Sequence, residues 1–263
     1  MTVQIILASV ALIVLAAYLL LELKRDLMMF QQNSYRPSRY RGWLSDSKDS
    51  TSLWRLGGMA IWFLAMSTFS SPVASLLIFI IYGASGAWTL ARRKYKKPLV
   101  WTARSRRIYS VAVLLSIAVS AAFVLFTLHA PVAIVLYLIS TALLACYCIS
   151  HVLIIAANYI LKPVEKAITA RYYNDAAARL RSMPELRVVG ITGSYGKTST
   201  KHYLYRILSE HFDTLMTPGS YNTTLGVVRT IRELLKPYNE VFFVEMGAKN
   251  RGDFKEICDL VHP

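Results

Sequence analysis

Long apolar runs dominate the first part of this chain and limit what it can fold into. Each of five runs is close to the roughly 20 residues that a helix needs to cross a bilayer. They cover about residues 3–21, 53–69, 73–90, 108–128 and 132–155. The whole chain has 263 residues, of which 55% are hydrophobic, and its mean hydropathy is +0.40. We therefore expect residues 1–161 to form a multi-span α-helical membrane region with about five transmembrane helices. No basic residue precedes the first run and no clear cleavage site follows it, so we interpret it as an uncleaved anchor.

The net charge of +15 lies mostly between the apolar runs. Lys and Arg gather after the first, third and fifth runs, whereas the turns at residues 70–72 and 129–131 carry none. Because basic loops stay on the cytosolic side, five spans place the N-terminus outside and the C-terminal region in the cytosol. Four or six spans would violate this rule. A nucleic-acid binder needs basic residues on a folded face, interleaved with aromatic residues, whereas here the basic residues sit mostly between hydrophobic runs. We therefore expect membrane lipid, and no nucleic acid, as a partner.

The predicted spans contain few groups that could carry chemistry. Arg55 stands at the edge of the second run, and we expect its long side chain to reach the membrane interface. Cys146 and Cys148 lie within the fifth run and Cys258 lies in the cytosolic region, so neither a disulfide nor a metal site is predicted.

Residues 162–185 form a charged segment between the membrane region and the rest of the chain. Val164, Ile168, Tyr172 and Leu180 recur at helical spacing, and Pro184 ends the pattern. We interpret this segment as a juxtamembrane amphipathic connector helix with a packing face. A cytosolic domain at residues 186–263 follows it.

A glycine loop opens the cytosolic domain. Residues 187–201 read RVVGITGSYGKTSTK, in which a short strand-type run turns through Gly193 and Gly196 into a helical pattern. A strand, a glycine loop and a helix form a phosphate-binding arrangement. The loop does not match the strict P-loop spacing, but it does match a shorter form, TGxxGKT. The alternative is a glycine-rich turn followed by a chance Lys-Thr, and the flanking strand and helix argue against it.

This loop supplies the predicted ATP site. Lys197 would reach the outer phosphates, and the hydroxyl of Thr198 would bind Mg²⁺. The predicted ATP-binding residues are Thr192, Gly193, Ser194, Tyr195, Gly196, Lys197, Thr198 and Ser199.

Strands and helices alternate after the loop. We predict a helix at residues 197–211 that buries Leu204, Ile207 and Leu208, a strand at 212–217, a helix at about 227–235 and a buried strand at 241–244. This order predicts an α/β P-loop-type nucleotide-binding domain with a parallel, doubly wound sheet. Glu245 directly follows the buried strand, where such a sheet places a Mg²⁺ ligand. The alternative for Glu245 is a solvated loop carboxylate.

Four pieces of this region carry a resemblance to a known family. They are residues 192–198 (TGSYGKT), 219–227 (GSYNTTLGV), 245–248 (EMGA) and 252–253 (GD). Together they resemble the first part of the central ATP-binding domain of the Mur ligase family. Within that family they are most similar to the ligases that add D-alanyl-D-alanine to UDP-N-acetylmuramoyl-tripeptide. The resemblance covers less than a third of the chain.

The resemblance implies an ATP-dependent peptide ligase of peptidoglycan synthesis in the plasma membrane of a bacterium. ATP would phosphorylate the carboxylate of a muramoyl-peptide acceptor, and the amine of a D-amino-acid dipeptide would attack the acyl phosphate. Lys197 and Asn222 would be catalytic, and Thr198 and Glu245 would hold Mg²⁺.

The chain also departs from the family pattern. Ser220, Thr223 and Val228 stand where the subfamily usually has two asparagines and a proline. Membrane spans replace the domain that grips the uridine nucleotide, and the chain ends at Pro263, partway through the central domain. We therefore expect a truncated chain that is inactive alone.

Three alternatives stay open at this point. The first is another ligase of the same superfamily, such as a membrane poly-γ-glutamate synthase. The second is an ATP-driven transporter subunit, which would need the strict P-loop spacing and a downstream Ser-Gly-Gly motif that the sequence lacks. The third is a non-catalytic membrane scaffold that senses nucleotide.

Overall fold

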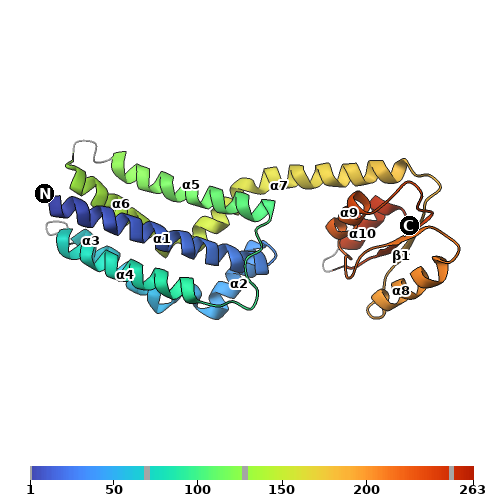
Figure 1. The fold of residues 1–263 in the computed structure, drawn as a ribbon, viewed down its shortest axis with the longest axis horizontal. Coiled ribbons are helices and arrows are strands. Elements are labelled where there is room, and N and C mark those ends of the chain that lie inside the picture. Colours follow the sequence, from blue (N-terminus) through green and yellow to red (C-terminus); the bar gives the residue numbers. More distant parts are fainter. Residues whose placement is uncertain (1, 68–71, 126–129, 249–251) are drawn as a thin grey trace. The chain divides into compact units, whose positions relative to one another are not determined.

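A computed structural model describes the chain except at residues 1, 68–71, 126–129 and 249–251. It divides into two compact units, Met1–Lys162 and Pro163–Pro263 (Figure 1). The described part of the first unit is helical, and the second unit contains a small sheet. The helices of the first unit are α1 (Thr2–Gln32), α2 (Pro37–Ser47), a 3-10 turn η1 (Asp49–Thr51), α3 (Leu53–Ser67), α4 (Pro72–Arg92), α5 (Ala103–Leu125), α6 (Val132–Cys148) and the start of α7 (Ser150–Arg181).

Over its described residues, each of the first four predicted apolar runs coincides with one helix. Within the part of the chain that the structure describes, three helices, α1, α4 and α5, are long and apolar enough to cross a membrane, and α6 with α7 would add a fourth as a broken span. The apolar stretch of α3, Leu53–Ala65, is shorter than a full span. The predicted ends of the second run at residues 68–69 and of the fourth run at 126–128 lie outside the described residues.

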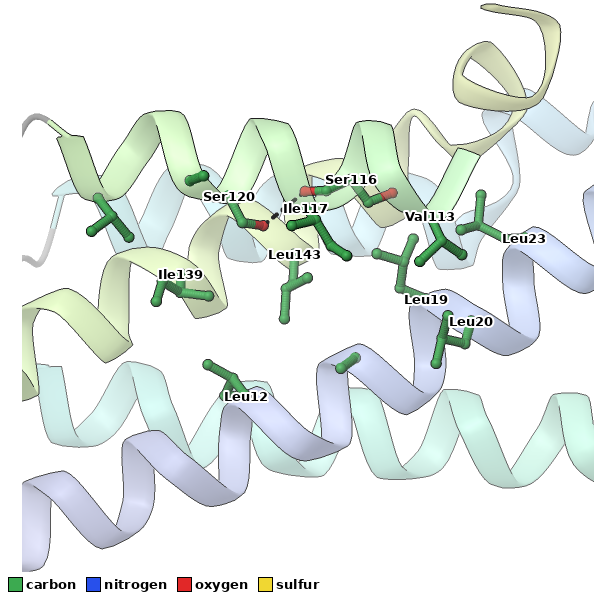
Figure 2. Close-up of a pocket in the computed structure, with 13 residues that line it drawn as sticks. Leu12, Leu19, Leu20, Leu23, Val113, Ser116, Ile117, Ser120, Ile139 and Leu143 are labelled. Atoms are coloured by element: carbon green, nitrogen blue, oxygen red, sulfur yellow. Dashed lines mark hydrogen bonds between the residues drawn. The ribbon is translucent and has the colours of Figure 1, made fainter. Parts of the chain in front are cut away.

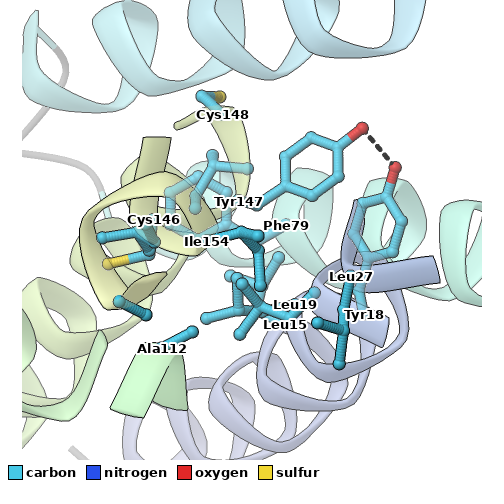
Figure 3. Packing of buried hydrophobic residues seen from close by; sticks show 14 of the residues in the cluster. Leu15, Tyr18, Leu19, Leu27, Phe79, Ala112, Cys146, Tyr147, Cys148 and Ile154 are labelled. Carbon is cyan, nitrogen blue, oxygen red and sulfur yellow. Dashed lines mark hydrogen bonds between the residues drawn. The ribbon is translucent and has the colours of Figure 1, made fainter. Parts of the chain in front are cut away.

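The core of the first unit forms where α1 packs against its neighbours. Leu15 and Leu19 of α1 are buried in this core together with Phe79 of α4 (Figure 3). Tyr18 donates a hydrogen bond of 2.6 Å to the hydroxyl of Tyr147, and the two rings stack with centroids 4.3 Å apart. A Cβ atom at Gly86 would lie only 2.3 Å from the Tyr18 ring, so the close approach of α4 to α1 requires glycine there.

The fifth predicted run is not one helix. α6 ends at Cys148, α7 begins at Ser150, and their axes differ by 78°. Arg55 of α3 stabilises this corner, because its Nη1 donates to the carbonyls of Tyr147 (3.1 Å) and Cys148 (3.2 Å) at the C-terminal end of α6. The side chain of Arg55 is buried among protein groups, since only 1% of this residue is exposed.

The second unit contains the end of α7 and a three-stranded parallel sheet. Its elements are β1 (Arg187–Ile191), α8 (Lys197–Leu208), β2 (Thr214–Met216), α9 (Thr224–Glu233), β3 (Val241–Glu245) and α10 (Asp253–Val261). The strand order is β1-β3-β2, and β3 pairs in parallel with both neighbours. This confirms the parallel sheet that the alternation of strands and helices predicts.

Helices cover both faces of the sheet. Phe242 and Val244 of β3 pack with α9, α10 and the end of α7. Val241 and Phe243 point the other way, in a cluster that Leu204 and Leu208 of α8 adjoin. This alternation follows from the period of two in a strand, and it makes the unit doubly wound as predicted.

Two predicted packing faces differ in the structure. Ile207 is 64% exposed, and Lys201 takes the buried position of α8 instead. In the connector, Val164 and Tyr172 are exposed, whereas Ala176 is buried in the core of the second unit. The connector is also continuous with the preceding helix, because α7 runs through Pro163 to Arg181.

Candidate functional site

The glycine loop joins β1 to α8 with the backbone that a phosphate loop requires. Gly193 has φ +147° and Gly196 has φ +77°, values that residues with a side chain rarely adopt. Gly196 is the N-cap of α8, and its lack of a side chain leaves the amides of the first helical turn without a side-chain cap. These amides and the helix dipole form a place for an anion. The loop from Thr192 to Gly196 is exposed, and the side chain of Tyr195 lies almost entirely in solvent.

Lys197 lies at the start of α8 and is folded back on the loop. Its Nζ donates a hydrogen bond to the carbonyl oxygen of Gly193. The ammonium group is therefore held over the loop, at the place where the sequence predicts a cation for the phosphates.

Glu245 lies at the C-terminal end of the central strand and is the centre of a polar cluster. Its Oε2 accepts hydrogen bonds from Thr198 Oγ1 and from Lys201 Nζ, each at 3.0 Å. Its Oε1 accepts a hydrogen bond from Asn222 Nδ2 at 3.2 Å. Only 1% of Glu245 is exposed, so the alternative of a solvated loop carboxylate is wrong. The structure thus brings together three of the predicted site residues, Thr198, Asn222 and Glu245.

The pKa of Glu245 reflects two opposing effects. Burial by itself raises the pKa of this carboxyl group. The hydrogen bonds from Lys201, Thr198 and Asn222 and the charge of Lys201 outweigh burial and hold the pKa below its usual value. The carboxylate is therefore ionised at neutral pH, as a metal ligand must be.

Lys201 is the member of the cluster that the sequence analysis missed. It is fully buried, and its Nζ also donates to the carbonyls of Thr217 (2.7 Å) and Gly219 (2.6 Å). Its spacing in the sequence could have indicated that it is buried. Lys201 lies three residues before Leu204 and seven before Leu208, which places it on the buried side of α8. A lysine on such a face needs acceptors inside the protein.

The loop before α9 is fixed to the same cluster. The carbonyl of Asn222 accepts a hydrogen bond of 2.7 Å from the amide of Gly247. A Cβ atom at Gly247 would lie 2.8 Å from Asn222 Cγ, so this close contact depends on glycine. Thr223 caps α9 by accepting a hydrogen bond from the amide of Gly226.

The residues of the cluster fit a Mg²⁺ ion by their chemistry. Thr198 and Glu245 place a hydroxyl oxygen and an ionised carboxylate together, and Mg²⁺ prefers such hard oxygen ligands. Mg²⁺ bound near phosphates usually takes only one or two protein ligands. Thr198 and Glu245 would match this number of ligands.

The first unit contains a separate cavity whose lining lacks the groups expected of a catalytic site. It has a volume of about 470 Å³ and lies among α1, α5 and α6 (Figure 2). Its walls are aliphatic apart from Ser116 and Ser120, whose hydroxyls donate to the carbonyls of Ala112 and Ser116 (both 3.0 Å). No lining group is left to orient a polar substrate.

Comparison with known proteins places the resemblance in the second unit. Residues 191–263 match the family model of the Mur ligase middle domain, and this match includes Lys197, Asn222 and Glu245. The chain is 34% identical over 100 residues to the UDP-N-acetylmuramoyl-tripeptide–D-alanyl-D-alanine ligase of Synechocystis sp.. It is 36% identical over 91 residues to the ligase of the same name from Escherichia coli. The predicted resemblance to the Mur ligases is thus confirmed for this part of the chain.

The comparison covers a limited part of each protein. The two alignments include 38% and 35% of this chain, and 21% and 20% of the respective relatives. The chain therefore spans about a fifth of the length of the curated relatives that it matches. No solved structure matches it significantly.

Proposed function

We propose that this chain is part of a membrane-anchored, ATP-dependent amide ligase of the Mur type. The observation that carries the proposal is the cluster of Thr198, Lys201, Asn222 and Glu245 at the end of β3, beside the glycine loop. The relatives are named for adding D-alanyl-D-alanine to a UDP-N-acetylmuramoyl-tripeptide. We extend that substrate class, a muramoyl-peptide acceptor and a D-amino-acid dipeptide, to the protein that contains this chain.

Each residue has a role that its position supports. Lys197 and the amides of the glycine loop would hold the ATP phosphates, and Thr198 and Glu245 would hold Mg²⁺. Bound Mg²⁺ supplies charge neutralisation for phosphoryl transfer. Asn222 lies against Glu245 and positions the polar loop next to the transferred group. Positioning and electrostatic stabilisation account for most of the catalysis in such reactions.

The proposed reaction has two steps. The acceptor carboxylate attacks the γ-phosphorus of ATP, ADP leaves, and an acyl phosphate forms. The amine of the dipeptide then attacks the acyl carbon, inorganic phosphate leaves, and the amine loses a proton as the amide bond forms.

We further propose that the first unit anchors the protein in the plasma membrane of a bacterium as a multi-pass domain. The N-terminus would lie outside and the ATP domain in the cytoplasm. Contacts within the unit support the proposal that the basic segments lie together at one end. Gln31, near the end of α1, forms hydrogen bonds with the backbone of Val100, which precedes α5. Arg25 of α1 forms an ion pair with Asp49, which precedes α3. The basic segments that follow the first and third runs therefore share one end of the unit, as the rule for basic loops requires.

The proposal is tested by ligase turnover of the complete gene product with ATP, a muramoyl tripeptide and the dipeptide. Lys197→Ala removes a cation next to developing negative charge, and we expect a loss of roughly 10²–10³-fold. Glu245→Gln should be partly rescued by raised Mg²⁺. Lys236→Ala, which removes an exposed lysine of the same unit, is the matched control and should keep normal turnover. Normal turnover of both site variants would contradict the proposal.

A further inference from the structure

A cleft lies where the ends of α1 and α4 meet the basic loop that follows α4. Its volume is about 340 Å³. Leu21 and Met28 of α1, Leu90 of α4 and Leu99 of the loop give it apolar walls. Both helices are among those apolar enough to cross a membrane, and the cleft lies at the end of each. It therefore occupies the level at which a membrane helix passes from hydrocarbon to headgroups.

The polar groups of the cleft are cationic or hydrogen-bond donors. Lys24, Arg25 and Arg93 line it, and no carboxylate is among its lining residues, although Arg25 is also paired with Glu22, Asp26 and Asp49 behind the lining. Lys24 and Arg93 are exposed. Arg25 Nε and the hydroxyl of Tyr95 are buried, and apart from the contact between these two side chains neither atom has a hydrogen-bond partner among the described residues. Buried donors without acceptors are costly, so these groups favour a ligand that brings acceptor oxygens.

The loop wall of the cleft is held in place rather than left free. The side chain of Gln31 donates to the carbonyl of Val100 at 2.8 Å and accepts from its amide at 3.0 Å. Gln32 donates to the carbonyl of Lys97 at 2.9 Å. These bonds attach the basic loop to the end of α1, and they fix Arg93 and Tyr95 in a segment with both ends anchored. The backbone that carries Arg93 and Tyr95 is thus held next to the end of α1.

We propose that this cleft binds the phosphate headgroup of an anionic lipid from the cytosolic leaflet. The inference rests on the membrane location proposed above. The phosphate oxygens meet Lys24, Arg93 and the buried donors of Arg25 and Tyr95, while an acyl chain continues along Leu21 and the apolar part of α1. Basic residues that only set topology would give a diffuse attraction to any anionic surface. A built cleft instead gives a saturable site with a defined stoichiometry.

The test is lipid binding by the purified chain in detergent, followed by native mass spectrometry. Dioleoyl phosphatidic acid is titrated against dioleoyl phosphatidylcholine, which has the same chains but a zwitterionic headgroup. We expect one phosphatidic acid to bind in preference to phosphatidylcholine. At about 1 kcal/mol for each basic residue, Lys24→Gln with Arg93→Gln should weaken this binding by about 30-fold. Arg39→Gln with Arg41→Gln removes the same charge from exposed positions on α2 outside the cleft, and should change binding by less than about twofold.

Each other outcome overturns the inference. If the two double variants lose the same amount of affinity for phosphatidic acid, the lipid is attracted to the basic surface in general and not to the cleft. If the wild-type chain binds both lipids equally, the cleft does not recognise the anionic headgroup. Displacement of phosphatidic acid by excess inorganic phosphate would mean that the site takes free phosphate rather than lipid. Alkaline carbonate extraction separates this inference from its premise. If the wild-type chain is extracted from membranes, the membrane location fails as well; if it is retained but binds no lipid, only the lipid site fails.

Discussion

Lys201 Nζ lies 3.0 Å from Glu245 Oε2, and both side chains are almost completely shielded from solvent. The same ammonium group donates to the carbonyls of Thr217 and Gly219. One side chain of α8 therefore fixes the carboxylate at the end of β3 and the loop that leads to Asn222. The ion pair holds the proposed metal ligand in place before any ligand binds.

Replacing Lys201 by Met should destabilise the second unit. The change leaves the buried carboxylate and the carbonyls of Thr217 and Gly219 without their shared donor, and breaking a buried pair from one side costs about 3–5 kcal/mol. Hydrogen exchange of the β3 amides in the detergent-solubilised chain measures this loss. Lys197→Met is the control on the same helix, because its ammonium contacts only a carbonyl of the exposed loop. Equal loss of protection in both variants would contradict the role assigned to Lys201.

The stability of the second unit should fall in acid because of Glu245. The pKa of this group is lower in the folded protein than its ordinary value of 4.5. Its contribution is therefore complete above pH 4.5 and is lost as the pH falls through the lower folded value. Hydrogen exchange or unfolding curves between neutral pH and pH 3 would measure the effect, and Glu245→Gln should flatten the acid part of the curve.

A matched carboxylate separates this effect from general acid sensitivity. The pKa of Asp175 is also lowered, chiefly by its hydrogen bond from Arg232, but this side chain is 43% exposed and solvent screens its interactions. Asp175→Asn should leave most of the acid response in place. If the Asn variant flattens the curve as much as Glu245→Gln, the assignment to Glu245 is wrong.

The parts of the second unit that follow local rules could be predicted from the sequence. The apolar run at 241–244 predicts a buried strand, and the glycines at 193 and 196 predict the loop, because both depend on residues that are close in the chain. Glu245 could be placed next to Thr198 because parallel strands end at one edge of a sheet. The contacts of Lys201 could not be predicted in this way, because its acceptors lie 16 to 44 residues away in the sequence.

Arg55 shows the same limit in the first unit. A basic residue at the edge of an apolar run suggests contact with water, but its partners lie 33, 29 and 92 residues away, at Glu22, Asp26 and Tyr147. The same separation in sequence explains why the break at Ile149 could not be predicted. The sequence of the apolar run does not show that Arg55, from another helix, binds the backbone carbonyls in the middle of the run. Long apolar runs therefore predict helices better than they predict where a helix ends.

Replacing Arg55 by Leu should strongly destabilise the first unit. Its guanidinium pairs with Glu22 at 2.8 Å and Asp26 at 3.1 Å, so the variant buries carboxylates without this cation and exposes the unpaired end of α6. We expect a loss of about 3–5 kcal/mol. The thermal midpoint of the detergent-solubilised chain, followed by thiol accessibility of the buried Cys148, measures it.

Two further variants show whether the ion pair causes this loss. Arg39→Leu removes an exposed cation at the same end of the unit and should have little effect. Asp26→Leu combined with Arg55→Leu removes both partners, and buried pairs replaced by apolar residues often recover stability. A double variant as unstable as the single one would show that the capping of α6, rather than the pair with Asp26, dominates.

The orientation of the first unit is tested by single cysteines after the three native cysteines are removed. Val132 is 63% exposed and directly follows the outer turn predicted at residues 129–131, whereas Lys94 is exposed in the basic loop after α4. Since basic loops stay in the cytosol, Val132→Cys should react with an impermeant thiol reagent on intact cells, and Lys94→Cys should react only after permeabilisation. Labelling of Lys94→Cys but not Val132→Cys on intact cells would reverse the topology and place the ATP domain away from its nucleotide.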